Sequence, residues 1–167
     1  SEEYDMINIE EKDMIINRIP AKTWNHLHMN QSRVLEVSIN RTGNLETKIS
    51  DVALLDSGKL TEGKIDEITG GCGQEIADIA RKSAVVPSFL ITDKKNDGCV
   101  RLNFRYGEES ADMNIIGIET KEDASIDVYM DFHGQKDGRG FAAVQTRMYA
   151  AKNSVIRLIQ VQRVGDE

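Results

Sequence analysis

The second half of the chain contains six short runs rich in Val, Ile, Phe and Tyr, and this feature constrains the fold more than any other. Short polar clusters separate the runs, and no segment between them has the length and period of a helix. The runs are PSFLIT (87–92), CVRLNFRY (99–106), MNIIGIE (113–119), SIDVYMDF (125–132), FAAVQTRMY (141–149) and VIRLIQVQRV (155–164). The sequence therefore predicts six strands and an all-β architecture from about residue 86 onwards.

The segments that lead into three of these strands resemble one another. They are Asp97-Gly98-Cys99, Asp123-Ala124-Ser125 and Asn153-Ser154-Val155. The distance along the sequence from one such segment to the next falls in the range that is typical of the repeats of a solenoid, in which stacked units cover one another's apolar faces. An antiparallel β-sandwich with similar turns explains the same pattern, so the repeat leaves both architectures open. In this alignment Cys99 takes the position of Ser125 and Val155, which favours a packing role for its side chain.

Residues 1–85 have a mixed α/β pattern. Trp24, Leu27 and His28 share one face of a short predicted helix. Alternation over residues 35–39 predicts a strand that ends in a turn at residues 40–44, and a second strand is predicted over residues 48–55.

A second helix is predicted over QEIADIARKSA (74–84), after the glycine-rich turn at residues 70–73. Glu75 lies in its first turn, and Arg81 and Lys82 lie near its last turn, as the helix dipole favours. We therefore expect an N-terminal α/β region at residues 1–85 and a β core at residues 86–167.

The charge of the chain limits the partners that it can bind. Lys and Arg number 21 against 28 Asp and Glu, which gives a net charge of −7. Sequence-independent binding of nucleic acid or of an anionic membrane needs a basic surface, so the prediction is no nucleic acid and no membrane partner, although a local basic patch remains compatible with this charge. No run of about 20 apolar residues and no signal-peptide pattern occurs, so a cytoplasmic location is expected.

The residues that usually carry chemistry do not form a recognisable motif. Cys72 and Cys99 lie far apart, with no C-x-x-C spacing, which favours reduced thiols in a cytosolic protein. His26 and His28 are separated by one residue and His133 stands alone, a poor pattern for one metal site. The Gly70–Gly73 turn does not match a phosphate-binding loop and is expected to cap the helix.

Three aspartates invite a comparison with paired catalytic carboxylates. Asp127 and Asp131 alternate with apolar residues, so they are expected on the solvated face of one strand, and Asp123 precedes that strand. A carbohydrate-active β-solenoid enzyme that uses these three residues is an alternative interpretation. We assign no catalytic, cofactor-binding or metal-binding residue.

Three stretches of the chain resemble the SufB/SufD family of iron–sulfur cluster assembly proteins. They are NRIPAKTWNHLHMN (17–30), TGGCGQEIADIA (69–80) and the run from about Asn114 through Val164, with AAVQTRMYAAKNSVIRLIQVQRVG. The resemblance implies that the β core is the first part of a longer, truncated right-handed parallel β-helix.

The resemblance also implies a function. Members of this family are non-catalytic scaffold subunits that pair with a SufB- or SufD-like paralogue, or with a second copy of themselves, and with a SufC-like ATPase. The transient iron–sulfur cluster belongs to the full complex, and its ligands in the family lie beyond the part that this chain resembles. No cofactor is therefore expected on this fragment, and the resemblance does not separate a SufB-like from a SufD-like role. A small β-sandwich binding module is the remaining alternative.

Overall fold

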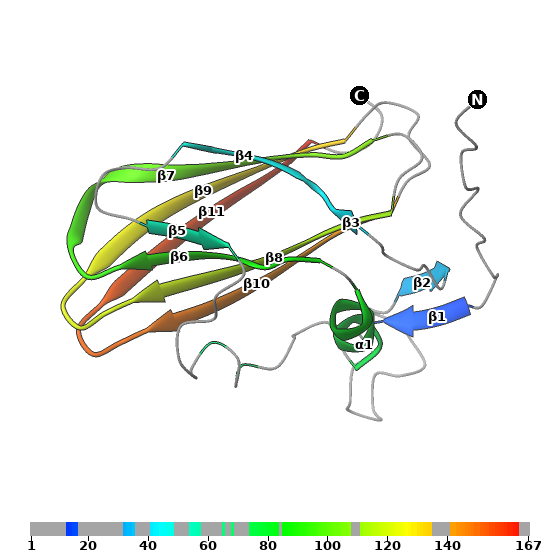
Figure 1. Cartoon of the computed structure of the whole chain (residues 1–167), viewed down its shortest axis with the longest axis horizontal. Coiled ribbons are helices and arrows are strands. Elements are labelled where there is room, and N and C mark those ends of the chain that lie inside the picture. Colours follow the sequence, from blue (N-terminus) through cyan, green and yellow to red (C-terminus); the bar gives the residue numbers. More distant parts are fainter. Residues whose placement is uncertain are drawn as a thin grey trace.

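The computed structural model describes residues 13–16, 32–35, 41–48, 54–57, 65, 68, 74–83, 85–107, 111–134 and 141–163. Within these residues the protein is mainly β, with one short helix, α1 (Gln74–Lys82). Two larger sheets face each other, and a separate antiparallel pair is formed by β1 (Asp13–Ile16) and β2 (Ser32–Leu35) (Figure 1).

We name the two larger sheets after their central strands. The β8 sheet has the order β10-β8-β6-β5, with β3 also paired to β8, and the β9 sheet has the order β11-β9-β7-β4. The strands of the β8 sheet are β3 (Arg41–Thr42), β5 (Leu54–Ser57), β6 (Ser88–Thr92), β8 (Ala111–Thr120) and β10 (Phe141–Ala150). Those of the β9 sheet are β4 (Asn44–Lys48), β7 (Lys95–Arg105), β9 (Ser125–His133) and β11 (Val155–Arg163).

The six strands predicted from residue 86 onwards are all present, as β6 to β11. Successive strands alternate between the two sheets, so each strand pairs with the next but one along the chain. All four of these pairings are parallel: β6 with β8, β8 with β10, β7 with β9, and β9 with β11. The antiparallel β-sandwich is therefore wrong for this region. The sequence pattern could not exclude it, because alternation within a strand does not depend on the direction of its neighbour.

The internal repeat is real, but its first copy has a different phase from the one that the sequence suggests. Ser125 lies opposite Val155, as predicted from the alignment of the second and third copies. Cys99, however, lies opposite Asp127, whereas Lys95 takes the position opposite Ser125. The register shifts between Lys95 and Cys99, and this irregularity in β7 displaces the expected alignment of the first two copies.

The later two repeats share a turn that explains their common Asp or Asn. Asp123 and Asn153 adopt left-handed backbone angles, with φ of 59° and 58°, which Asp and Asn tolerate better than most residues. The two turns also bond to each other, because Asp123 N–H donates to the Lys152 carbonyl at 3.1 Å. Stacking of one turn on the next therefore follows the stacking of the strands.

The main apolar core fills the space between the two sheets. Every second residue of the central strands points inwards, so Ile116 and Ile118 of β8 belong to one cluster with Val128 and Met130 of β9. Phe104 of β7 and the corresponding Phe132 of β9 stack at a centroid distance of 4.8 Å.

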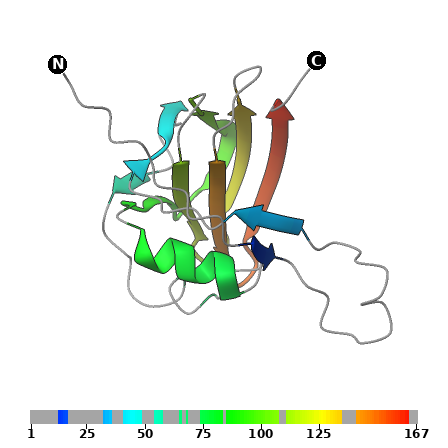
Figure 2. The same ribbon diagram turned by 90° about the vertical axis from the view of Figure 1, so that its right-hand side faces the viewer.

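A second apolar cluster lies on the outer face of the β8 sheet, where α1 packs. Ala80 of α1 and Val85 belong to this cluster together with Ala111 and Met113 near the beginning of β8. The predicted helix is confirmed, including Glu75 in its first turn and Arg81 and Lys82 in its last turn. Figure 2 shows α1, in green, beside the ends of β8 and β10. The helix therefore covers the outer face of the β8 sheet only at the end where β8 and β10 begin.

The turn predicted at residues 40–44 is instead a crossing between the two sheets. Arg41 and Thr42 pair with β8, Gly43 follows, and Asn44 begins the strand that pairs with β7. Gly43 N–H donates to the Met113 carbonyl at 3.1 Å. The chain therefore continues across the end of the core rather than folding back beside itself.

The two strands predicted in the first region are observed only in part. Of residues 35–39, the structure describes residue 35, which ends β2. Of residues 48–55, it describes residue 48 at the end of β4 and residues 54–55 at the beginning of β5. These two positions lie in different sheets, so a single strand over 48–55 is wrong.

Other predictions concern residues outside the described part of the chain. These are the helix around Trp24 with His26 and His28, the glycine-rich turn at residues 70–73, and Cys72. The division at residue 85 stays a prediction. Strands β3, β4 and β5 from the first region do pair with strands of the second.

Candidate interaction surface

Most of the charged residues that lie within the described strands are on the outer face of the β9 sheet. Val100, Ile126 and Ile156 and their alternate neighbours point into the core, so the residues between them point outwards. The outward cations are Lys48, Lys95, Arg101, Arg105, Arg157 and Arg163. Among the side chains that the structure describes, the outward carboxylates are Glu46, Asp127 and Asp131. All of these side chains except Asp131 are exposed or half-buried.

This surface is basic although the chain is acidic. Among the side chains that the structure describes there, six cations against three carboxylates leave a net charge of +3 with His133 neutral, whereas the whole chain carries −7. The rest of the chain therefore carries −10, which is −7 minus +3. We call the described outward side chains of β4, β7, β9 and β11 the basic face. It is the local basic patch that the composition left open.

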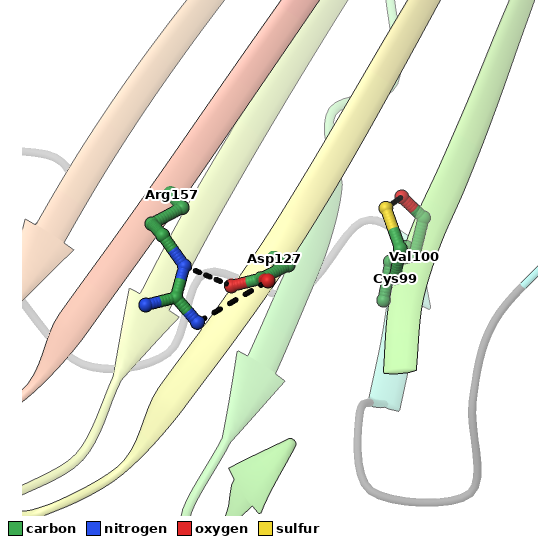
Figure 3. Close-up of polar contacts among 4 residues, drawn as sticks. All are labelled: Cys99, Val100, Asp127 and Arg157. Atoms are coloured by element: carbon green, nitrogen blue, oxygen red, sulfur yellow. Dashed lines mark hydrogen bonds and ion pairs between the residues drawn. The ribbon is translucent and has the colours of Figure 1, made fainter. Parts of the chain in front are cut away.

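Three carboxylates are held in ion pairs with arginines across neighbouring strands. Arg157 contacts both oxygens of Asp127, at 2.8 Å from Nε and 3.2 Å from Nη2 (Figure 3). Arg163 Nε lies 3.3 Å from Asp131, and Arg105 Nε lies 3.4 Å from Glu46. Lys48, Lys95 and Arg101 have no such pair with a carboxylate in the described part of the chain.

One row of side chains crosses all four strands of the basic face. Lys48 lies opposite Arg101, Arg101 opposite Tyr129, and Tyr129 opposite Ile159. The Arg101 guanidinium stacks on the Tyr129 ring at 5.2 Å from its centroid. Ile159 at the end of the row is 58% exposed. This row combines cations, an aromatic ring and an exposed aliphatic side chain.

The three predicted aspartates do not come together as a catalytic group. Asp127 and Asp131 are on the outer face of β9, and the strand between them separates them by about 13 Å. Asp127 is half-buried, but Asp131 is buried rather than solvated as predicted, because Arg163 and His133 pack against it. Paired carboxylates of glycosidases lie about 5–9.5 Å apart. Asp123 lies in the turn before β9. Both strand aspartates are also paired with arginines, so the geometry does not support this interpretation.

His133 is the one predicted histidine that the structure describes. It ends β9 between Arg105 and Arg163 of the neighbouring strands. Its Nε2 lies 3.2 Å from Asp131 Oδ2. No three His, Cys, Asp or Glu side chains among the described residues form a group that could hold a metal.

Cys99 lies on the basic face rather than in the core. Its side chain is exposed, and its Sγ lies 3.6 Å from the carbonyl oxygen of Val100, on the strand beside Asp127 and its partner Arg157 (Figure 3). The packing role predicted from the repeat is therefore wrong. The register shift in β7 moves Cys99 to the position opposite Asp127, on the solvated face.

A buried polar cluster lies where the chain crosses between the sheets. Asn114 donates to the Gly43 carbonyl at 3.0 Å, and a Cβ at Gly43 would lie 2.5 Å from Asn114 Oδ1. Burial, together with the negative charge of Asp112, raises the pKa of the Tyr106 hydroxyl well above its usual range. Within the described residues, neither this hydroxyl nor Asn114 Oδ1 has a hydrogen-bond partner.

The ion pairs of the basic face were not recognised in the sequence, although a signal for them was present. Extending the alignment of the second and third repeats along their strands places Arg157 opposite Asp127. The neighbours Arg101 and Tyr129 belong to the first two repeats, whose alignment is changed by the irregularity in β7. Their contact could therefore be found only after that irregularity was known.

Searches of protein-family models, of curated proteins and of solved structures find no match to this chain. No helix in the described part of the chain is long and apolar enough to span a membrane.

Proposed function

We propose that the protein is a scaffold subunit of a SufBCD-type iron–sulfur cluster assembly complex. In this proposal the strands β6 to β11 form the first part of a right-handed parallel β-helix. The partners are a SufC-like ATPase and a SufB- or SufD-like paralogue or second copy. The transient cluster belongs to the complex, and nucleotide hydrolysis belongs to the ATPase.

The parallel stacking of the repeats supports this proposal more than any other observation. Strands β9 and β11 pair in register over their whole length, and so do β8 and β10. Like residues stack between units, as Phe104 does on Phe132, and Thr120 Oγ1 lies 2.8 Å from Ser154 Oγ. Strand–crossover–strand connections between parallel strands are almost always right-handed, which favours the proposed hand.

The last strand of each sheet supports a role in assembly. β10 and β11 each have a strand partner on one side only among the described residues. Met148 of β10 and Val155 of β11 are each 44% exposed. An edge with unpaired backbone groups and exposed apolar side chains is a surface on which another strand can add.

The proposal is tested by isolating the protein from its own cells under anaerobic conditions. A tag is placed on the full reading frame at its native expression level, and the copurified proteins are identified by mass spectrometry. Iron and acid-labile sulfide are measured on the same sample, with an untagged strain as the control.

We expect stoichiometric recovery of a SufC-like ATPase together with a second subunit of the SufB/SufD family, or with a second copy of the protein. Iron and sulfide should follow this complex through gel filtration. Recovery of the protein without an ATPase, and without iron and sulfide, would overturn the assembly role.

A further inference from the structure

We propose that the basic face docks an acidic segment of a partner protein, with an apolar side chain of that segment placed against Tyr129 and Ile159. The inference rests on the geometry of this face and does not require the assembly role. Its first support is charge, because a face of +3 on a chain of −7 attracts an acidic partner.

The cations of the face differ in how available they are. Arg157 and Arg163 are engaged by the carboxylates of β9. Lys48, Lys95 and Arg101 are exposed and have no carboxylate partner in the described part of the chain. Lys48 and Arg101 are direct neighbours across β4 and β7, so two available positive charges lie side by side. This pair is the expected contact for the carboxylates of the partner.

The apolar part of the face lies in the same row. Tyr129 is held by the stacked Arg101 guanidinium, and Ile159 beside it is 58% exposed. Tyrosine and arginine are enriched among the residues that carry binding energy at protein interfaces. Because the ring and the guanidinium already pack together, little side-chain entropy is lost when a partner binds.

The same features argue against a nucleic acid as the occupant. Asp127, Asp131 and Glu46 interleave with the cations, so a continuous phosphate backbone would meet these carboxylates along its length. A short acidic segment can place its carboxylates at Lys48 and Arg101 alone. Ile159 offers no contact to phosphate, and the neighbouring Tyr129 ring, on which a base could stack, already carries the Arg101 guanidinium. An acidic peptide with an apolar side chain can contact both the cations and the apolar side chains of the row.

The size of the face fits a transient contact. Four strands span about 14 Å between the outermost axes, and the strands extend about 30 Å along their length. A segment that lies along the row contacts only these four strands, so we expect it to bury less than the ~800 Å² per partner of a standard stable interface. We therefore expect binding that is readily reversible and sensitive to salt.

The test uses the purified full chain and a fluorescein-labelled synthetic peptide of Glu and Gly with one central Phe, followed by fluorescence anisotropy. A peptide with Lys in place of Glu and a single-stranded oligothymidine are the comparison probes. The test variant is Lys48→Glu/Arg101→Glu. The matched control is Lys82→Glu/Lys152→Glu, which makes the same charge change at two exposed lysines outside the face.

We expect the wild-type chain to bind the acidic peptide. Any binding of the basic peptide to the acidic remainder of the chain should not be weakened in the test variant. The test variant should lose about tenfold in affinity, and the control variant should stay within about twofold. Ile159→Ser should weaken binding at low and at high salt, because its contribution is not electrostatic.

Four outcomes would overturn the proposal. They are no binding of the acidic peptide, equal losses in the test and control variants, tighter binding of the oligothymidine than of the peptide, and unchanged affinity of Ile159→Ser. Far-UV circular dichroism of each variant checks that the fold is retained.

Discussion

The two sheets of this protein have the same construction but opposite outer faces. Both have central strands in parallel register, and both contribute alternate residues to one shared core. The outer face of the β8 sheet is apolar where β8 begins, with Met113 fully buried in the cluster that includes α1, and it carries Glu119 and Arg147 farther along the strands. The outer face of the β9 sheet is charged, and Ile159 remains exposed on it. The residues at every second position decide whether a sheet face binds a helix or stays in water.

On the outer face of the β8 sheet, the Phe89 ring occupies the space beside Gly117, which has no side chain. A Cβ on Gly117 would lie 2.4 Å from the Phe89 ring, so the ring crosses the neighbouring strand where a side chain is absent. Phe89 is 1% exposed, and Ile65 also approaches this position. On the basic face, by contrast, the long charged side chains extend into solvent.

The largest expected difference in stability is between two variants, each of which shortens one apolar side chain on the outer face of one sheet. Met113→Ala should lower the free energy of unfolding by about 2–5 kcal/mol, because it leaves a cavity between β8 and α1. Ile159→Ala is the matched change on the basic face and should cost less than about 0.5 kcal/mol. Urea denaturation of both variants measures the difference. Equal costs would show that the basic face is covered in solution.

A smaller loss of stability is expected when a methyl group is added at Gly117. Gly117→Ala should destabilise the protein by about 1–3 kcal/mol, since the Phe89 ring must move. The cost should fall in a Phe89→Leu background, where the smaller side chain leaves room. A double-mutant cycle by urea denaturation measures this coupling, and additive costs would contradict the predicted contact.

The third prediction concerns Tyr106 at the end of the shared core. Tyr106→Phe should leave the free energy of unfolding at pH 7 unchanged or raise it by up to about 1 kcal/mol, because the buried hydroxyl has no hydrogen-bond partner within the described residues. A loss above about 1 kcal/mol would show that the hydroxyl is bonded in solution.

The same substitution should change the response to alkaline pH. The phenol of an unfolded chain has a pKa of about 10, and burial keeps the Tyr106 hydroxyl protonated above that value. The unfolded chain therefore loses this proton first, and the free energy of unfolding falls as pH rises above about 10. Unfolding measured from about pH 9 to about pH 11 should show a steeper decline for the wild-type chain than for Tyr106→Phe. Parallel declines would contradict the burial of the hydroxyl.

The smallest effect is expected from the ion pairs of the basic face. The coupling between Asp127 and Arg157, measured with a double-alanine cycle, should be about 0.2–1 kcal/mol, since both side chains are partly exposed. It should nearly disappear in about 1 M salt. A coupling that resists salt would indicate a pair shielded from water, contrary to the exposed face described above.

Much of the fold could be predicted because strand patterns are local. The apolar runs from PSFLIT to VIRLIQVQRV match β6 to β11, and the helix at QEIADIARK matches α1. The phase of the first repeat was not predictable, because the irregularity between Lys95 and Cys99 has no strong sequence signal. This single shift also explains the wrong environment predicted for Cys99.

The candidate surface was less predictable than the fold. The sequence placed Asp127 and Asp131 on a solvated face, but it could not show that Arg157 and Arg163 pair with them. Those pairs depend on the register between two strands that are far apart in the sequence. Similarly, the sequence around Gly43 was interpreted as a turn. Only the pairing of the residues before it with β8 and after it with β7 shows that the chain crosses between the sheets.

The order of residues along the chain was enough to locate the strands of the β core and the apolar side of each, because both depend on sequence neighbours. It was also enough to align Asp123 with Asn153 before their strands, and in the structure both residues have a positive φ. Three features followed only from the folded chain. They are the parallel pairing of the strands, the packing of α1 on one end of the β8 sheet, and the position of six cations on the outer face of the β9 sheet. These features depend on contacts between distant segments, and hydrophobic alternation is compatible with either strand direction.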